Sequence, residues 1–187
     1  MISKKIKSVI VIILLAIIAI EISTVLANNL FFEKVALKEA EKRSMPKETS
    51  NAIKHAYAAS LIYSTLRSLF LSENIAKNIT IFLGKANEIA EIIFKPNQDS
   101  TLEMIKDLNN NLLGVCAGKW IEENSENPAM QERLAFIGNL AQRKKLFLWR
   151  SDVVLSEKQK NELGKSPSYF TAAKFFEENA DKISCEF

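Results

Sequence analysis

Three short segments of the chain place polar residues where the core face of a helix would favour apolar ones. The first, SNAIKHAYAASL (50–61), contains the only histidine of the 187 residues. Asn51 lies four positions before His55, so the two side chains share one face of a helix. Imidazole is the side chain that most often transfers protons in catalysis, and it also binds metal ions. His55 is therefore the first candidate reactive group.

The second and third polar segments supply carboxylates and amides. GKANEIAEI (84–92) carries Asn87 and Glu88 beside small residues, and MIKDLNNNLLG (104–114) follows. Four residues of the third segment share one helix face because their spacings are three and four: Asp107, Asn110, Asn111 and Gly114. Asparagine is a poor residue for a helix interior because its amide competes for backbone hydrogen bonds. Three asparagines in succession within a helix therefore predict that their side chains have a specific role in the folded protein.

Two kinds of chemistry are open to these residues if the segments meet. Glu88 or Asp107 could orient His55 as a general base. The same carboxylates could bind one hard cation through oxygen, with the carbonyls of Asn110 or Asn111 as further ligands. The alternative is structural, because buried polar residues on facing helices usually form a hydrogen-bond network that fixes packing. Glu88 could also be a solvated charge on a helix surface.

The elements that must position these residues are helices. Apolar residues recur at helical spacing, and capping residues or prolines mark the breaks. We expect helices over 29–43, 47–71, 72–94, 99–120 and 128–145, and two more that begin at Ser156 and Ser166. Residues 146–155 are the one stretch that could form a strand. The sequence predicts an all-α fold, a single helical bundle of about six to seven helices after an N-terminal hydrophobic signal or anchor helix.

The first 27 residues resemble a targeting segment more than a part of the bundle. A stretch with three lysines precedes an apolar run over residues 9–20, which Glu21 ends. An apolar run of this length fits a signal-peptide core, and a signal peptidase could cut after Ala27. If the segment is not cut, residues 8–27 would act as a membrane anchor, because a helix needs about 20 residues to span a bilayer.

Both alternatives place the rest of the chain outside the cytoplasm, because the basic residues before the apolar run stay inside. We expect one domain over residues 28–187, with the polar motifs at 50–115. It would be anchored in the inner membrane and face the periplasm, or be periplasmic or secreted after cleavage. In an oxidising compartment Cys116 and Cys185 could form a disulfide, or they could remain two thiols.

Composition excludes several classes of protein. The chain has 25 basic and 22 acidic residues, and this net charge of +3 is too small to indicate a nucleic-acid-binding face. Two cysteines and one histidine cannot form a four-thiolate zinc site or a His-Glu-x-x-His metalloprotease site. The membrane is the partner that the sequence indicates, through residues 8–27 if they are uncleaved. The sequence identifies no protein partner and no cofactor.

The order of the polar segments resembles a largely uncharacterised family of exported bacterial domains that also form the C-terminal domains of polymorphic toxins. The family pattern reads Asp-Ala-x-Arg-His-Ala, then Ala-His-Glu, then Met-Asp-x-x-Asn-Asn-x-x-Gly. This chain offers NAIKHA (51–56), ANE (86–88) and KDLNNNLLG (106–114), which together span roughly a third of its length. The third motif is fairly specific, and order and spacing support the first two. The resemblance implies a helical domain with a clustered polar site at His55, Glu88, Asp107, Asn110, Asn111 and Gly114.

Two positions depart from the family pattern. Asn51 stands where the pattern has Asp, which removes a carboxylate one turn from His55. Asn87 stands where the pattern has His, which removes a second proton carrier or metal ligand. We therefore predict a non-catalytic envelope protein, or a degenerate copy, with a structural polar cluster. The alternative is a hydrolase of an envelope lipid, peptide or glycan that uses His55, Glu88 and Asp107, in one version with a metal ion.

Overall fold

The chain forms seven α-helices over the residues that the structure describes. This computed structural model describes residues 29–187 except 95–100, 127 and 166–167, and no strand occurs among them. The helices are α2 (Asn29–Lys42), α3 (Ser50–Ser68), α4 (Glu73–Phe94), α5 (Thr101–Asn124), α6 (Met130–Gln142), α7 (Glu157–Lys165) and α8 (Tyr169–Asn179). Three short 3-10 helices are Lys47–Thr49, Arg150–Asp152 and Ala180–Lys182. The predicted all-α fold is confirmed.

The predicted signal or anchor segment, residues 1–27, lies outside the described residues. No helix in the described part of the chain is both long enough and apolar enough to span a membrane. Residues Phe32–Phe187 form one compact unit, and the site described below lies within it.

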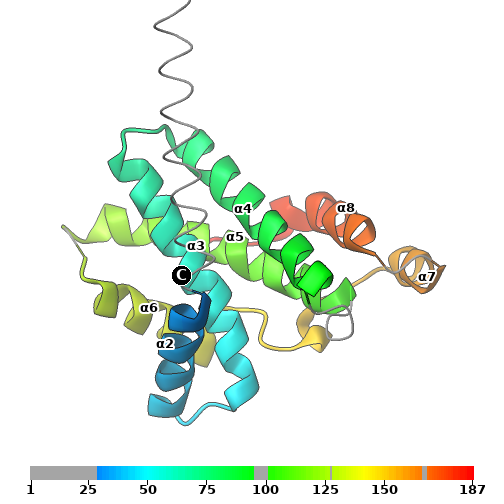
Figure 1. Ribbon diagram of the computed structural model, residues 1–187, viewed down its shortest axis with the longest axis horizontal. Coiled ribbons are helices and arrows are strands. Elements are labelled where there is room, and N and C mark those ends of the chain that lie inside the picture. Colours follow the sequence, from blue (N-terminus) through cyan, green and yellow to red (C-terminus); the bar gives the residue numbers. More distant parts are fainter. Residues whose placement is uncertain (1–28, 95–100, 127, 166–167) are drawn as a thin grey trace, which may run out of the picture. The chain divides into compact units, whose positions relative to one another are not determined.

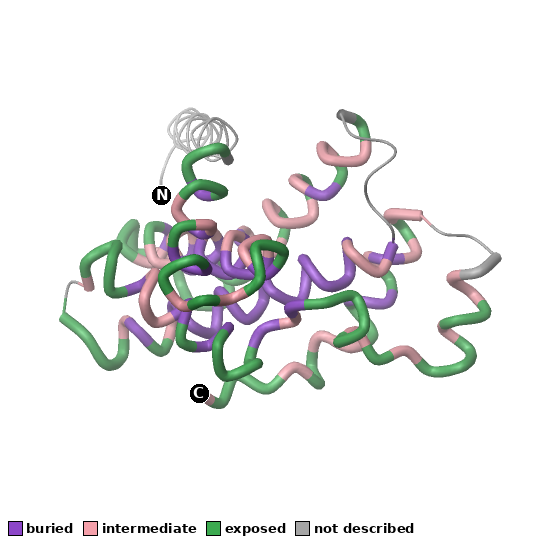
Figure 2. The backbone as a smooth tube through the Cα atoms, turned by 90° about the horizontal axis from the view of Figure 1, so that it is seen from below, coloured by how far each residue is buried: buried purple, intermediate pink, exposed green. Residues whose placement is uncertain are grey.

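Helix α5 is the core of this unit. Every residue from Met104 to Gly118 is buried, because α3, α4, α6 and α8 all pack against it. Figure 1 shows α3 and α4 crossing α5, and Figure 2 shows the buried stretch as a continuous purple segment. A helix covered on all sides has no solvent face to which polar residues can be assigned. The polar residues of the third motif are therefore inside the protein.

Small residues allow α3 and α5 to pack closely. A Cβ at Gly114 would collide with the backbone carbonyl of Ala56 and with the side chain of Ala59. A Cβ at Gly118 would lie 3.1 Å from the backbone oxygen of Ser60, which is also a tight contact. This close approach brings the polar residues of α3 within reach of those on α5.

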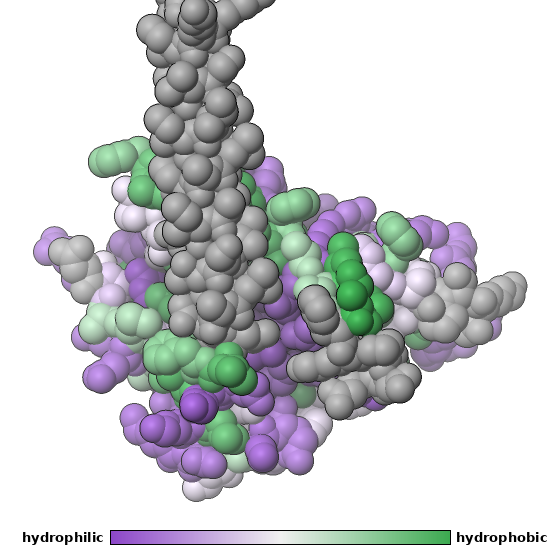
Figure 3. All heavy atoms as spheres, in the orientation of Figure 1, coloured by the Kyte–Doolittle hydropathy of each residue, from purple (hydrophilic) through white to green (hydrophobic). Residues whose placement is uncertain are grey.

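Helix α4 partly reverses the usual amphipathic pattern. Glu88 and Thr80 are each only 1% exposed, whereas Phe82 and Ile93 are about two-thirds exposed, at 65% and 66%. Figure 3 shows apolar side chains among polar ones on the face that carries α4. A buried glutamate on a helix with exposed apolar residues indicates that Glu88 has a role inside the protein.

Three helices are followed by a residue with a left-handed backbone conformation that is not glycine. Ser44, Phe70 and Lys144 follow α2, α3 and α6 with φ values of 55°, 62° and 56°. The next residue in each case donates its backbone N–H to a carbonyl five positions back, as in Met45 to Ala40 at 3.0 Å. This is the Schellman ending. It stops α3 at Ser68, before the predicted end of that helix at residue 71.

The stretch 146–155 is an extended connection with one 3-10 turn, so the option of a strand there is wrong. Its backbone groups are held by side chains: the Asp152 carboxylate accepts from the N–H groups of Leu148 and Trp149 at 2.8 and 2.9 Å. The side chain of Asn110 on α5 binds the backbone of Phe147. At residues 147–149 these side chains take the place of a strand partner.

Serine caps begin three of the helices. The predicted caps at Ser72 and Ser156 are confirmed, with Ile75 N–H and Gln159 N–H donating to the two hydroxyl oxygens at 3.4 and 3.3 Å. At α8 the cap is Ser168, which accepts from Thr171 N–H at 3.2 Å. The predicted Ser166 lies outside the described residues.

Candidate functional site

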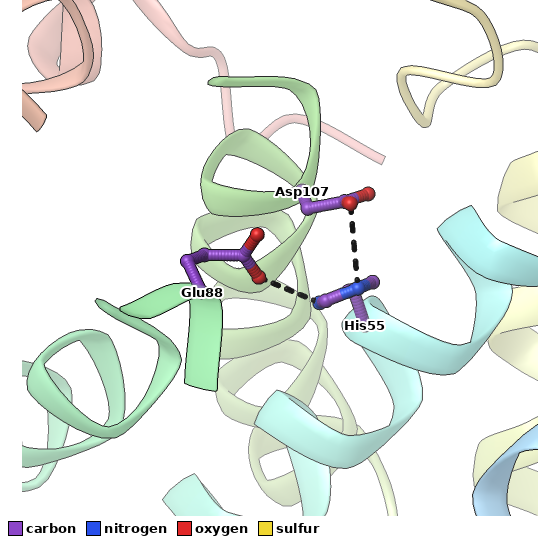
Figure 4. Close-up of side chains that lie close together, drawn as sticks. All are labelled: His55, Glu88 and Asp107. Carbon is purple, nitrogen blue, oxygen red and sulfur yellow. Dashed lines mark ion pairs between the residues drawn. The ribbon is translucent and has the colours of Figure 1, made fainter. Parts of the chain in front are cut away.

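The three side chains with acid–base chemistry meet inside the protein. His55 from α3 lies between Glu88 from α4 and Asp107 from α5 (Figure 4). His55 Nδ1 is 3.8 Å from Glu88 Oε1, and His55 Nε2 is 3.5 Å from Asp107 Oδ2. The side chains are 4%, 1% and 2% exposed. We call these three residues the buried triad.

Asp107 is the most firmly held member of the buried triad. The Asn51 amide donates to both of its carboxylate oxygens at 3.2 Å, and Lys106 Nζ lies 3.3 Å from Oδ1. Lys106 is 3% exposed and also pairs with Glu103. Burial raises the pKa of Asp107 to about 7, and the charge of Lys106 opposes this rise. The carboxylate is therefore oriented from two sides with its Oδ2 towards His55.

Glu88 is held less firmly, with a side-chain hydrogen bond to Asn87. Its Oε1 is buried and accepts no hydrogen bond from the described residues. Burial raises the pKa of Glu88 well above its usual range, and the charges of Asp107 and Glu91 raise it further. Lys54 opposes this rise, but its ammonium group pairs with Glu91 at 3.7 Å. Among the described residues, Glu88 is thus a buried acid that forms no ion pair with a lysine or arginine.

The surroundings of His55 favour the neutral form of its imidazole. Burial lowers its pKa well below the usual range, the charges of Lys54 and Lys106 lower it further, and a hydrogen bond with Asn111 opposes them. Its Nε2 is buried and has no hydrogen-bond partner in the described part of the chain. A neutral imidazole with a free nitrogen can accept a proton or bind a cation.

The other predicted site residues fall into separate surroundings. Asn111 lies beside His55 and against Gly84, and its Nδ2 has no hydrogen-bond partner among described residues. Asn87 donates to Glu91 at 3.1 Å. Asn110 binds the backbone of Phe147 and Gly114 packs on α3, so these two predicted residues serve packing.

The candidate pair Cys116 and Cys185 forms a disulfide. It joins α5 to the C-terminal tail across 69 residues of sequence, with the two Cα atoms 5.4 Å apart. Cys116 is buried, whereas Cys185 is exposed.

The charged residues beside Asp107 were not predicted as site residues. Glu103 and Lys106 flank it on α5, and Arg150 pairs with Glu103 at 2.8 Å. A signal was present, because Glu103, Lys106 and Asp107 are spaced so that their side chains lie on neighbouring turns. A lysine at such a spacing is ordinarily a solvated charge, and only its burial distinguishes Lys106.

The buried triad also has the composition of a cation site. One ligand atom from each residue lies within 4.8 Å of the other two. A groove of about 950 Å³ lies elsewhere, between α5, the segment 144–156 and the C-terminal tail, and none of the triad residues lines it.

No protein-family model matches the chain, and no curated protein and no solved structure matches it either. The family resemblance of the segments 51–56, 86–88 and 106–114 therefore stays a prediction.

Proposed function

We propose that the chain is an exported helical protein of the bacterial envelope, in which buried polar residues join helices rather than catalyse a reaction. In this proposal residues 8–27 anchor it in the inner membrane, or cleavage near Ala27 releases residues 28–187 to the periplasm or beyond. The lysines before the apolar run support this orientation. The Cys116–Cys185 disulfide also supports export, because disulfides persist in oxidising compartments.

The burial of the triad is the observation that supports a non-catalytic role for these residues. Its three side chains are at most 4% exposed, and the 950 Å³ groove lies elsewhere. A general base must come within about 3.2 Å of the proton that it removes, directly or through one water. A lipid, peptide or glycan cannot approach His55 this closely while the helices stay packed.

The alternative is an envelope hydrolase that uses His55, Glu88 and Asp107. One observation favours it: Asp107 lies 3.5 Å from His55 Nε2 and is held there by Asn51. A carboxylate fixed beside an imidazole is the arrangement that orients a general base. This reading needs the helices around the buried triad to open when substrate binds.

The variant His55→Ala separates the two functions. We expect the free energy of unfolding of the full chain in mild detergent to fall by about 1–3 kcal/mol, because two buried carboxylates lose their neighbour. Ser60→Ala on the same helix is the control, since the Ser60 hydroxyl has no hydrogen-bond partner in the described part of the chain. We expect no hydrolysis of phospholipid, peptide or glycan substrates by the wild type. Hydrolysis that His55→Ala abolishes at unchanged stability would favour the alternative.

The envelope location has its own test. A reporter enzyme that is active only outside the cytoplasm is fused to the C-terminus, and the mass of the mature chain is measured. We expect an active reporter, with a mass that shows either the whole chain or a product cut near Ala27. An inactive reporter on a well-expressed fusion would contradict export.

A further inference from the structure

Two members of the buried triad and one neighbour have polar atoms without partners. These atoms are His55 Nε2, Glu88 Oε1 and Asn111 Nδ2, and none has a hydrogen-bond partner among the described residues. Buried polar groups are normally satisfied, because an unsatisfied group loses its hydration without compensation. A cluster of them around one imidazole indicates that a further group binds there.

The charges around the triad show what kind of group would fit. Four carboxylates lie in or beside it: Glu88, Glu91, Glu103 and Asp107. Three basic side chains face them, and each is already paired: Lys54 with Glu91, Lys106 with Glu103 and Asp107, and Arg150 with Glu103. The carboxylate left over is Glu88. A positive charge between Glu88 and Asp107 would compensate it, because a buried carboxylate is costly without a counter-charge.

We propose that His55, Glu88 and Asp107 bind one divalent transition-metal ion, which ties α3, α4 and α5 together. The donor set is one imidazole nitrogen and two carboxylate oxygens, and the two carboxylates balance a charge of +2. Imidazole ligands suit zinc, iron, copper or nickel, whereas calcium and magnesium prefer oxygen ligands alone. We therefore take Zn²⁺ as the principal probe.

One of the distances between the proposed ligand atoms is close to that of a metal site. Ligand atoms that bind one ion at about 2.0–2.2 Å lie roughly 3–3.5 Å apart around it. His55 Nε2 and Asp107 Oδ2 are 3.5 Å apart. The ligand atoms of all three residues lie within 4.8 Å of one another. Glu88 Oε1 lies 3.8 Å from the other ring nitrogen, Nδ1, so the Glu88 side chain would have to move to join Nε2 and Asp107 Oδ2 around one ion.

Neighbouring side chains orient the proposed ligands, as hydrogen bonds to the ligands do in metal sites. Asn51 donates to both oxygens of Asp107, and Lys106 lies 3.3 Å from Oδ1, which leaves Oδ2 facing His55. His55 also shares a side-chain hydrogen bond with Asn111. Metal-bound histidines usually use their second nitrogen for such a bond, which fixes the ring.

The ion would stabilise the fold rather than react with a substrate. Its three ligands come from three helices, so the site exists only in the folded chain, and binding is coupled to folding. The proposal goes beyond the envelope function, which requires only a closed cluster. A failure of metal binding therefore leaves that function intact.

The test starts from the full chain in mild detergent, unfolded in denaturant with chelator and refolded with Zn²⁺, Mn²⁺, Ca²⁺ or Mg²⁺. Metal per chain is measured by mass spectrometry after gel filtration, and the thermal unfolding midpoint is recorded. We expect one equivalent of Zn²⁺ and a midpoint several degrees above that of the chelated protein, with no retention of Ca²⁺ or Mg²⁺. A wild type that retains no stoichiometric transition metal would overturn the proposal.

Two carboxylate variants on α4 locate the ion. Glu88→Gln keeps the size of the side chain and should lower Zn²⁺ affinity at least about tenfold. Glu73→Gln, at the other end of the same helix, removes a carboxylate that pairs with Lys119 and should bind Zn²⁺ like the wild type. Asp107→Asn serves as a second ligand variant if Glu88→Gln does not fold. Equal retention of Zn²⁺ by the ligand variants and by Glu73→Gln would contradict the assignment.

Discussion

The amide of Asn110 shows how one side chain can replace a strand partner. Its Nδ2 donates to the Phe147 carbonyl and its Oδ1 accepts from the Phe147 N–H, both at 2.9 Å. Asn110 has no solvent exposure, so water cannot satisfy these groups in its place. This pair of hydrogen bonds ties the segment after α6 to the middle of α5.

Replacing Asn110 should therefore lower the free energy of unfolding more than replacing its neighbour Asn109 does. We expect Asn110→Ala to lower the free energy of unfolding by about 1–3 kcal/mol, because two backbone groups of Phe147 lose their partners. Asn109→Ala is the matched control, since Asn109 Oδ1 has no hydrogen-bond partner in the described residues. Urea unfolding measures both variants, and hydrogen exchange should become faster at the Phe147 amide in Asn110→Ala alone. Equal losses of unfolding free energy in the two variants would contradict this role of Asn110.

Asn51 suits the charges around it better than the aspartate of the family pattern would. Its amide lies 3.2 Å from both oxygens of Asp107 and 3.3 Å from Glu103. An aspartate here would place a third carboxylate against these two and would repel them. Asn51 departs from the family pattern, which suggested the loss of a catalytic group. In the structure its amide instead donates the hydrogen bonds that hold Asp107.

At the scale of elements, the packing of α3 on α5 determines where the polar residues meet. The contact runs along small residues, with Gly114 against Ala56 and Ala59, and with Ala52 and Ala117 completely buried. Close backbone approach shortens the distance that a side chain must cover between the helices. The Asn51 amide on α3 therefore reaches Asp107 on α5 directly.

A methyl group at Gly114 tests this packing. Alanine has the better helix propensity by about 1 kcal/mol, yet we expect Gly114→Ala to lower stability by about 1–3 kcal/mol. The reason is that the new Cβ would meet the backbone of Ala56, which cannot move without shifting α3. Gly84→Ala is the control, because its Cβ would meet the amide end of the Asn111 side chain. Thermal unfolding measures the stability of both variants. A Gly114→Ala variant more stable than the wild type would contradict the close approach of α3 and α5.

At the scale of the whole compact unit, the disulfide joins the ends of a long stretch of chain. Cys116 lies in the buried part of α5, and Cys185 lies in the tail after α8. The ring of Phe187 contacts that of Phe136 on α6, with centroids 5.9 Å apart. The tail is thus held by a covalent bond and by an aromatic contact.

Opening this disulfide should destabilise the folded chain strongly. A cross-link that closes 69 residues restricts the unfolded chain, and such a loop contributes about 4 kcal/mol in the chain-entropy account. We expect the double variant Cys116→Ser/Cys185→Ser to lose about 2–4 kcal/mol of unfolding free energy. The reduced wild type should match this variant in urea unfolding. An unchanged unfolding midpoint after complete reduction would contradict the prediction.

The sequence by itself determined the helices, their order and the choice of unusual residues. Helix formation depends on spacings of three and four and on local caps, so Ser72 and Ser156 could be recognised from the sequence. The same local rules identified His55, Glu88 and Asp107 as polar residues on helix faces. They did not show the ends of α3 and α6, because Phe70 and Lys144 carry no glycine signal.

Only the tertiary structure decided what each polar residue does. Neighbouring asparagines point to different surroundings: Asn110 binds Phe147, which is 37 residues away, and Asn111 lies beside His55, which is 56 residues away. The burial of Lys106 and the lack of a counter-charge at Glu88 likewise depend on how α3, α4 and α5 pack. Periodicity describes one helix at a time, whereas charge compensation in a core is a property of several helices together.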